Sequence, residues 1–204
     1  MQYRFNTASI MKFKLTLLIF CSILHLHAQT NEKSSPNHYF SVQWLGWTLH
    51  PNGGSMPQNN PWKLDPKAVF LLNPGVAFSY DWQFKKHVFW RAAAGYYGDC
   101  ALLNAGYIHF GFRWEALRFG RHTFNGGFGP GFFFRQDWHR FSEYQGDPIY
   151  GNRVWQGWQY RMFPVIGEVE YLFKINERWQ FQYSVVPGYP IVINSKMGVR
   201  FLLK

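Results

Sequence analysis

The sequence predicts an all-β protein, an eight-stranded antiparallel transmembrane β-barrel of the bacterial outer membrane. Three observations predict it. Eight segments alternate bulky apolar residues with small or polar ones at a period of two, as strands with two different faces do. The connections between these segments alternate between short, charged turns and longer loops rich in Gly, Pro and Trp. The N-terminus carries the features of an export signal.

Residues 1–28 are predicted to be a signal peptide. Lys12 and Lys14 precede a short apolar run at residues 15–24, and Ala28 supplies the small residue that a signal peptidase requires. The apolar run is too short to span a bilayer as a helix. The sequence therefore predicts an exported chain without a helical anchor at this position.

The rest of the chain is predicted to hold a short N-terminal segment, residues 29–37, and the barrel, residues 38–204. Met11 is an alternative start of the chain, because residues 1–10 add nothing to the export signal. One of the two cysteines lies in the signal peptide, so Cys100 would be the single thiol of the mature chain. A chain with one thiol forms no internal disulfide.

Composition excludes several other classes of protein. Two cysteines are too few for a disulfide scaffold or a multi-cysteine zinc module. A mean hydropathy of −0.27, with no long apolar run after residue 28, excludes a helical membrane bundle. The formal net charge of +10 would suit a nucleic-acid binder, but the basic residues are spread over turns and strands, so we expect no nucleic-acid partner.

The predicted strands follow one another with little irregular sequence between most of them. The alternation is clearest in Trp-Gln-Phe-Gln-Tyr-Ser-Val at residues 179–185, where aromatic and polar side chains occupy opposite faces. The eight strands are predicted at residues 39–49, 70–82, 88–97, 106–116, 123–135, 158–173, 179–185 and 191–203.

An exported, water-soluble β-sandwich is the alternative fold, because its strands share the period of two. Tyr and Trp residues at the predicted strand ends favour the membrane, where such residues form girdles at the two interfaces. In a barrel the short connections would face the periplasm and the longer loops would lie outside the cell.

The fifth strand predicts a cavity inside the barrel. Gly127, Gly129 and Gly131 would all face inward, and the interior of an eight-stranded barrel is otherwise just wide enough to be filled by its own side chains. We therefore expect these glycines to line a site for a small molecule, such as a lipid chain.

Charged residues are also predicted on the inward faces. Unpaired charges in the interior would be costly, so they are expected to form a polar plug near the periplasmic end, with the two acids offsetting the four bases. The residues concerned are Arg91, Arg113, Lys196, Arg200, Glu168 and Glu170.

Three reactive residues are predicted to meet at the extracellular rim. His50 ends the first strand, and Asp99 and Cys100 follow the third. A histidine that takes a proton, a carboxylate that orients it and a nucleophilic thiol are the minimum set for acyl transfer. The alternative interpretation is that the histidine is simply exposed and the cysteine simply buried.

Several short motifs resemble the lipid A palmitoyltransferase family (PagP-type) of the Gram-negative outer membrane. These motifs are Phe-Gln-Tyr-Ser-Val-Val-Pro-Gly at 181–188, the Gly-rich run 127–138 ending in Arg-Gln-Asp-Trp, Trp-Thr-Leu-His at 47–50 and Gly-Asp-Cys at 98–100. The likeness extends over most of residues 39–204 at low identity.

The resemblance implies an eight-stranded barrel that moves a palmitoyl-like acyl chain from a phospholipid to lipid A or a related acceptor. It places His50, Asp99 and Cys100 at the catalytic positions, with cysteine where the family has serine. It also implies that Pro164 and Pro187 open the sheet between the sixth and seventh strands, because proline removes a donor from the ladder.

Two alternatives to acyl transfer remain open. One is a lipid hydrolase, or deacylase, in which water replaces the lipid acceptor and for which His139 and Ser142 offer a loose pair. The other is a non-enzymatic outer-membrane barrel that binds a hydrophobic ligand. We expect a monomer with no cofactor and no metal in each case.

Overall fold

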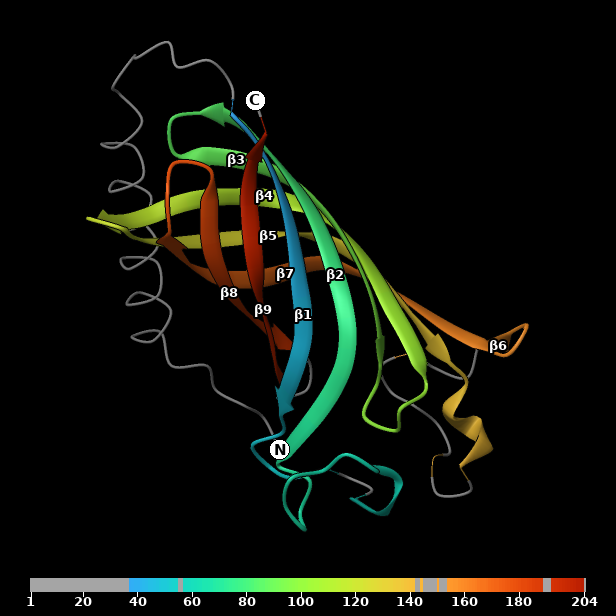
Figure 1. Cartoon of the computed structure of the whole chain (residues 1–204). Helices are drawn as coiled ribbons and strands as arrows, with labels where there is room; N and C mark the ends of the chain where they lie inside the picture. The colour runs from blue at the N-terminus through green and yellow to red at the C-terminus, as the bar shows by residue number, and fades with distance from the viewer. Residues whose placement is uncertain are drawn as a thin grey trace, which may run out of the picture. The chain divides into compact units, whose positions relative to one another are not determined.

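The computed structural model describes residues 37–54, 57–141, 144, 150, 154–188 and 192–203. The predicted signal peptide and all but one residue of the predicted N-terminal segment lie outside the described residues. All of the described residues belong to the unit that begins at Pro36 and extends to Lys204 (Figure 1).

The described chain is almost entirely β-strand, with two 3-10 helices, η1 (Pro57–Asn59) and η2 (Trp138–Arg140). The strands are β1 (His38–Leu49), β2 (Phe70–Lys85), β3 (Val88–Gly98), β4 (Asn104–Phe119), β5 (His122–Gln136), β6 (Val154–Trp155), β7 (Trp158–Lys174), β8 (Trp179–Gly188) and β9 (Val192–Leu203).

Eight of these strands close into an antiparallel barrel. Each strand from β1 to β4 pairs with the next, β5 pairs with β7, and β7, β8 and β9 continue the ring until β9 pairs with β1. The predicted fold is therefore confirmed, and so are all eight predicted strands, most of them extended by a few residues. The two-residue strand β6 was not predicted, because it only lengthens β7 into a hairpin.

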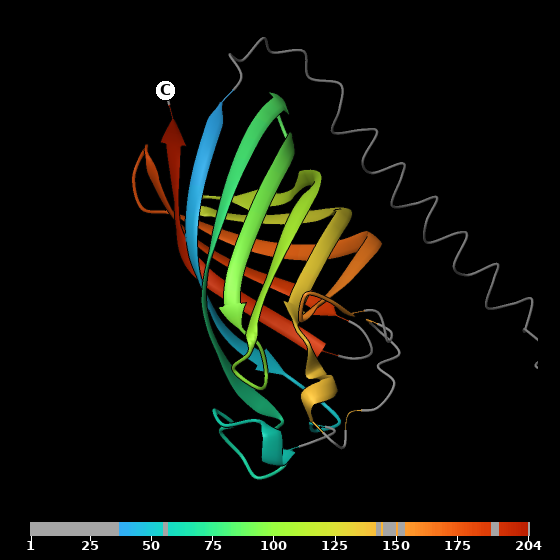
Figure 2. The same ribbon diagram turned by 90° about the vertical axis from the view of Figure 1, so that its right-hand side faces the viewer.

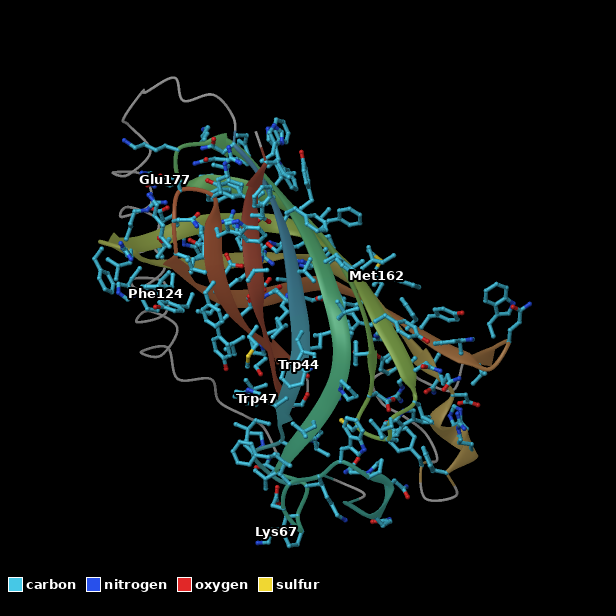
Figure 3. All side chains as sticks on the ribbon, viewed as in Figure 1. Trp44, Trp47, Lys67, Phe124, Met162 and Glu177 are labelled. Atoms are coloured by element: carbon cyan, nitrogen blue, oxygen red, sulfur yellow. The ribbon has the colours of Figure 1, made fainter. Side chains whose placement is uncertain are left out.

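The two ends of the barrel differ. We call one the short-turn end, because it carries the tight connections β2–β3, β4–β5 and β7–β8, and the other the long-loop end. Glu177 marks the short-turn end and Lys67 the long-loop end in Figure 3. Both 3-10 helices lie at the long-loop end (Figure 2).

The barrel is apolar outside and polar inside. Trp44 is 48% exposed, Phe124 38% and Met162 67%, and all three point away from the barrel axis (Figure 3). Inward positions on the same strands hold buried Gln43 and Asn125. A water-soluble sandwich shows the reverse arrangement, so this pattern identifies a barrel whose outer surface faces lipid, as in the bacterial outer membrane. The predicted localisation is therefore confirmed.

No helix within the described ranges is long and apolar enough to cross a membrane.

The wall of the barrel is incomplete between β7 and β8. These strands pair only from Val169–Val185 to Lys174–Gln180, while the far end of β7 pairs with β6 at residues 158–159. Residues 160–168 of β7 thus have no ladder partner among the described residues on the side that faces β8. We call this interruption the β7–β8 gap.

Candidate functional site: an interior cavity beside a gap in the wall

Seven charged side chains, which we call the ionic cluster, fill the half of the interior nearer the short-turn end. They are Asp81, Arg91, Arg113, Glu168, Glu170, Lys196 and Arg200, and all except Asp81 were predicted to pair there. Arg91 is at the centre, with its Nε 2.6 Å from the Asp81 carboxylate and its Nη1 2.7 Å from that of Glu170.

Glu168 belongs to the ionic cluster and also faces the interior on the long-loop side of it. Its carboxylate contacts Arg113 and lies 2.9 Å from the Lys196 Nζ. Arg200 completes the set through Asp81, at 2.9 Å. The cluster thus contains four cations and three carboxylates, so its members leave one positive charge uncompensated.

A cavity of about 60 Å³ lies between the ionic cluster and the long-loop end. Its walls are mainly apolar. Trp47, which is labelled in Figure 3, is one of the lining residues. The lining residues are Leu45, Trp47, Thr48, Asn73, Tyr97, Tyr107, His109, Phe133, Ile166, Glu168, Val186, Asn194, Ser195 and Lys196. Because Ile166 belongs to β7 and Val186 to β8, the cavity lies beside the β7–β8 gap.

The floor of the cavity is polar. His109 is only 6% exposed, and its Nε2 atom has no hydrogen-bond partner in the described structure. The Lys196 ammonium lies 2.9 Å from Glu168 and donates to the Tyr107 hydroxyl at 3.5 Å. A buried polar atom without a partner is unusual in a folded protein, so the Nε2 of His109 is a position where a ligand atom would be stabilised.

The three inward glycines of β5 are buried, as predicted, but the lining of this cavity does not include them. A Cβ on Gly127 would lie 2.2 Å from the Arg113 side chain, and one on Gly131 would lie 2.2 Å from Ile166. The Arg113 and Ile166 side chains therefore occupy the space beside Gly127 and Gly131. The role of Gly127, Gly129 and Gly131 in binding stays a prediction.

Pro164 and Pro187 lie on either side of the β7–β8 gap. Pro164 is within a bulge of β7, where the register with β5 shifts between Gly129–Ile166 and Gly131–Phe163. Pro187 pairs with β9 but has no partner on β7. The ladder between the two strands stops short of both prolines, which is where the resemblance implied an opening. Their contact with a substrate stays a prediction.

The rim of the long-loop end brings two of the three predicted catalytic residues together. His50 follows β1, Cys100 follows β3, and the His50 Nε2 lies 3.5 Å from the Cys100 Sγ. Neither residue lines the cavity.

The Asp99 carboxylate bonds to its own loop and to Trp138, and its role in orienting His50 stays a prediction. This carboxylate accepts hydrogen bonds from the Trp138 Nε1 at 2.6 Å and from the backbone N–H groups of Ala101 and Leu103, each at 2.9 Å. These contacts fix the β3–β4 loop and hold Trp138 of η2 against it. Within the described part of the chain the three residues therefore form a His–Cys contact, with the Asp99 carboxylate bonded elsewhere.

Burial opposes the activation of this thiol. Desolvation, with the nearby Asp99 carboxylate as a smaller cause, raises the pKa of Cys100 to about 12. Desolvation also lowers the pKa of His50, so that the imidazole is neutral at neutral pH and cannot stabilise a thiolate as a cation. The pair is thus a neutral thiol beside a neutral imidazole.

We expect Cys100 of the folded protein to react with iodoacetamide at neutral pH at least about a hundredfold more slowly than a free cysteine peptide does. Because the raised pKa keeps the thiol protonated, the rate should climb with pH until about 12. Mass spectrometry of the alkylated chain gives the rate, and the Cys100→Ala variant corrects for Cys21. If the folded protein reacted as fast as the peptide, the Cys100 thiol would not be buried and protonated as described.

An aromatic cage around Arg135, which was not predicted from the sequence, lies at the long-loop end. The Arg135 guanidinium lies 4.5 Å from the Trp138 ring centroid and 4.1 Å from that of Tyr150. It also donates to Gln159 at 3.0 Å. The abundance of Trp and Tyr in this loop is the signal that could have indicated the cage.

Of the pair suggested for a hydrolase, the structure describes His139 alone, and the pair stays a prediction. The Nδ1 of His139 lies 2.7 Å from the carboxylate of Asp137, which also caps η2. Ser142 lies outside the described residues.

No family model and no curated protein matches the sequence. Among solved structures, Ail, the attachment invasion locus protein of Yersinia pestis, is 11% identical with a TM-score of 0.48, over 83% of this chain and 100% of Ail. The N-terminal β-barrel domain of Pseudomonas aeruginosa OprF is 9% identical with a TM-score of 0.45, over 83% of this chain and 100% of that domain. The de novo designed TMB2.3 is 7% identical with a TM-score of 0.47, over 85% of this chain and 99% of the design.

These comparisons correct one prediction. The structural neighbours are barrels of the Ail and OprF type, and no family model supports the motif likeness, so the predicted membership in the lipid A palmitoyltransferase family is wrong. The physical reason is that Trp-rich, Gly-rich alternating strands are what any small membrane barrel requires, so short motifs of this kind do not identify one family.

Proposed function

We propose that this protein is a non-enzymatic outer-membrane barrel that binds one hydrophobic chain of a membrane lipid in its interior cavity. The observation that carries the proposal is the position of the cavity beside the β7–β8 gap. Ile166 and Val186, one from each strand, line the cavity where the wall between them has no ladder. A chain could therefore pass from the membrane into the cavity without crossing the polar ends of the barrel.

The chemistry of the walls supports the same function. Leu45, Phe133 and Ile166 offer apolar surface to a chain, whereas most of the interior on the short-turn side is charged. Each buried CH₂ group of a ligand contributes about 0.8 kcal/mol, so even a few methylene groups give useful affinity. The lipid partner is thus the part of the predicted function that the cavity supports.

A second candidate function is acyl transfer or lipid hydrolysis at the rim. The observation that favours it is the 3.5 Å contact between the His50 Nε2 and the Cys100 Sγ. The raised pKa of Cys100 and the engagement of Asp99 by Trp138 weigh against it. Loss of a lipid product in a Cys100→Ala strain, with the barrel still assembled, would support this candidate over simple binding.

Two neighbouring substitutions test the binding site. Ile166→Trp fills the cavity beside the gap, whereas Val165→Trp adds the same ring at a position that is 67% exposed on the outer face. Native mass spectrometry of the folded barrel with methyl palmitate should show one bound chain in the wild type and in Val165→Trp. Ile166→Trp should lower the affinity at least about tenfold, since a bulky ring excludes the chain. Equal binding by all three proteins would contradict the site.

A further inference from the structure

We propose that the cavity recognises a carboxylate, and that its ligand is a free fatty acid whose head group lies between His109 and Lys196. This inference rests on the proposed function and adds the chemical identity of the head group. Three features of the floor carry it: a charge imbalance, an unpartnered donor or acceptor, and limited space.

The charge imbalance calls for an anion. The four cations of the ionic cluster are all buried, and among the described residues three carboxylates pair with them. Lys196 is the cation of this set that lines the cavity, and it shares Glu168 with Arg113 and Arg91. A buried charge is costly unless it is paired, so one further carboxylate in the cavity would balance the cluster.

The unpartnered Nε2 atom of His109 supplies a second contact for the carboxylate of the ligand. His109 lines the same cavity as Lys196, and its Nε2 makes no hydrogen bond in the described structure. A carboxylate has two oxygens, and with the proton of the imidazole on Nε2 the floor offers one N–H donor from each residue. Hydrogen bonds of this kind to a charged group are stronger than those between neutral groups.

Limited space selects the class of lipid. A cavity of about 60 Å³ holds a carboxylate and the first part of a chain, but not a glycerophosphate head group with its second acyl chain. The apolar side chains of Ile166 and Val186, on the two strands that border the β7–β8 gap, line the same cavity. The rest of the chain would then extend through the gap toward the surrounding lipid.

The test compares palmitic acid with methyl palmitate, using native mass spectrometry of the full chain folded in micelles. The wild type should bind the acid at least about tenfold more tightly than the ester. Lys196→Met should remove that preference while the affinity for the ester stays unchanged. Lys174→Met is the matched control, because Lys174 is exposed and pairs only with Glu177 in the described structure; it should behave as the wild type.

His109→Phe provides a second variant, because it keeps a ring and removes Nε2 even if Lys196→Met fails to assemble; it should weaken the acid about tenfold and leave the ester unchanged. Equal affinity of the wild type for acid and ester would overturn the carboxylate site and leave the binding function intact. Binding of neither probe would overturn both. A preference for the acid that survives His109→Phe and a folded Lys196→Met would also overturn the assignment.

Discussion

Arg91→Met is expected to destabilise the barrel by about 3–5 kcal/mol, the largest effect that we predict. The Arg91 guanidinium is buried and donates to both oxygens of Asp81, at 2.6 and 2.8 Å, while it also pairs with Glu170 at 2.7 Å. Methionine keeps much of the volume but leaves these carboxylates facing one another with one cation fewer. The free energy of unfolding in urea, measured in lipid vesicles, gives the size of the effect.

Lys174→Met is the control for this experiment. It also breaks an ion pair, the one with Glu177 at 2.7 Å, but the two side chains are 43% and 89% exposed. A pair in contact with water contributes about 0–1 kcal/mol. If Arg91→Met cost no more than Lys174→Met, the ionic cluster would not stabilise the barrel.

Gly129→Ala is expected to destabilise the barrel by about 3 kcal/mol, because the added methyl group has no room. A Cβ at this position would lie 1.9 Å from the Phe110 carbonyl oxygen and 2.4 Å from the Gly111 Cα. These are backbone atoms of β4, so the two strands would have to separate. The unfolding midpoint in urea and the yield of folded barrel measure the loss.

Gly167→Ala is the matched control, since a Cβ on Gly167 meets no atom within 4 Å. Gly167 lies on β7 and pairs with Phe128 of β5, the neighbour of Gly129. Its effect on stability should be within about 0.5 kcal/mol. A similar loss in both variants would mean that the close approach of β4 and β5 is not what requires glycine at position 129.

The fold could be predicted from the sequence because successive residues of each barrel strand alternate between the lipid-facing side and the interior. The alternation at residues 179–185 shows the lipid-facing aromatics and the inward glutamines at once. The ionic cluster could be predicted for the same reason, since the period of two places Glu168 and Glu170 on one face. Asp81 was on the inward face of its strand but was not assigned to the cluster, because pairing across the interior depends on the register between strands.

The site was harder to predict, because its properties depend on burial and on competing partners. The order of strands and loops predicted that His50 and Cys100 lie at the same rim, and the two side chains are in contact there. Nothing in the sequence shows that Trp138 engages Asp99, or that burial raises the pKa of Cys100. The cavity lies above Lys196 and His109 instead of over the β5 glycines, because Arg113 and Ile166 fill the space those glycines leave.

The ionic cluster also determines what cannot pass through the protein. It occupies the half of the lumen nearer the short-turn end, and Arg91 and Glu170 within it are at most 2% exposed. A solute that reached the cavity would meet this layer of buried, paired charges on its short-turn side. If a lipid chain enters between β7 and β8 as we propose, the ionic cluster therefore limits how far it can move toward the short-turn end.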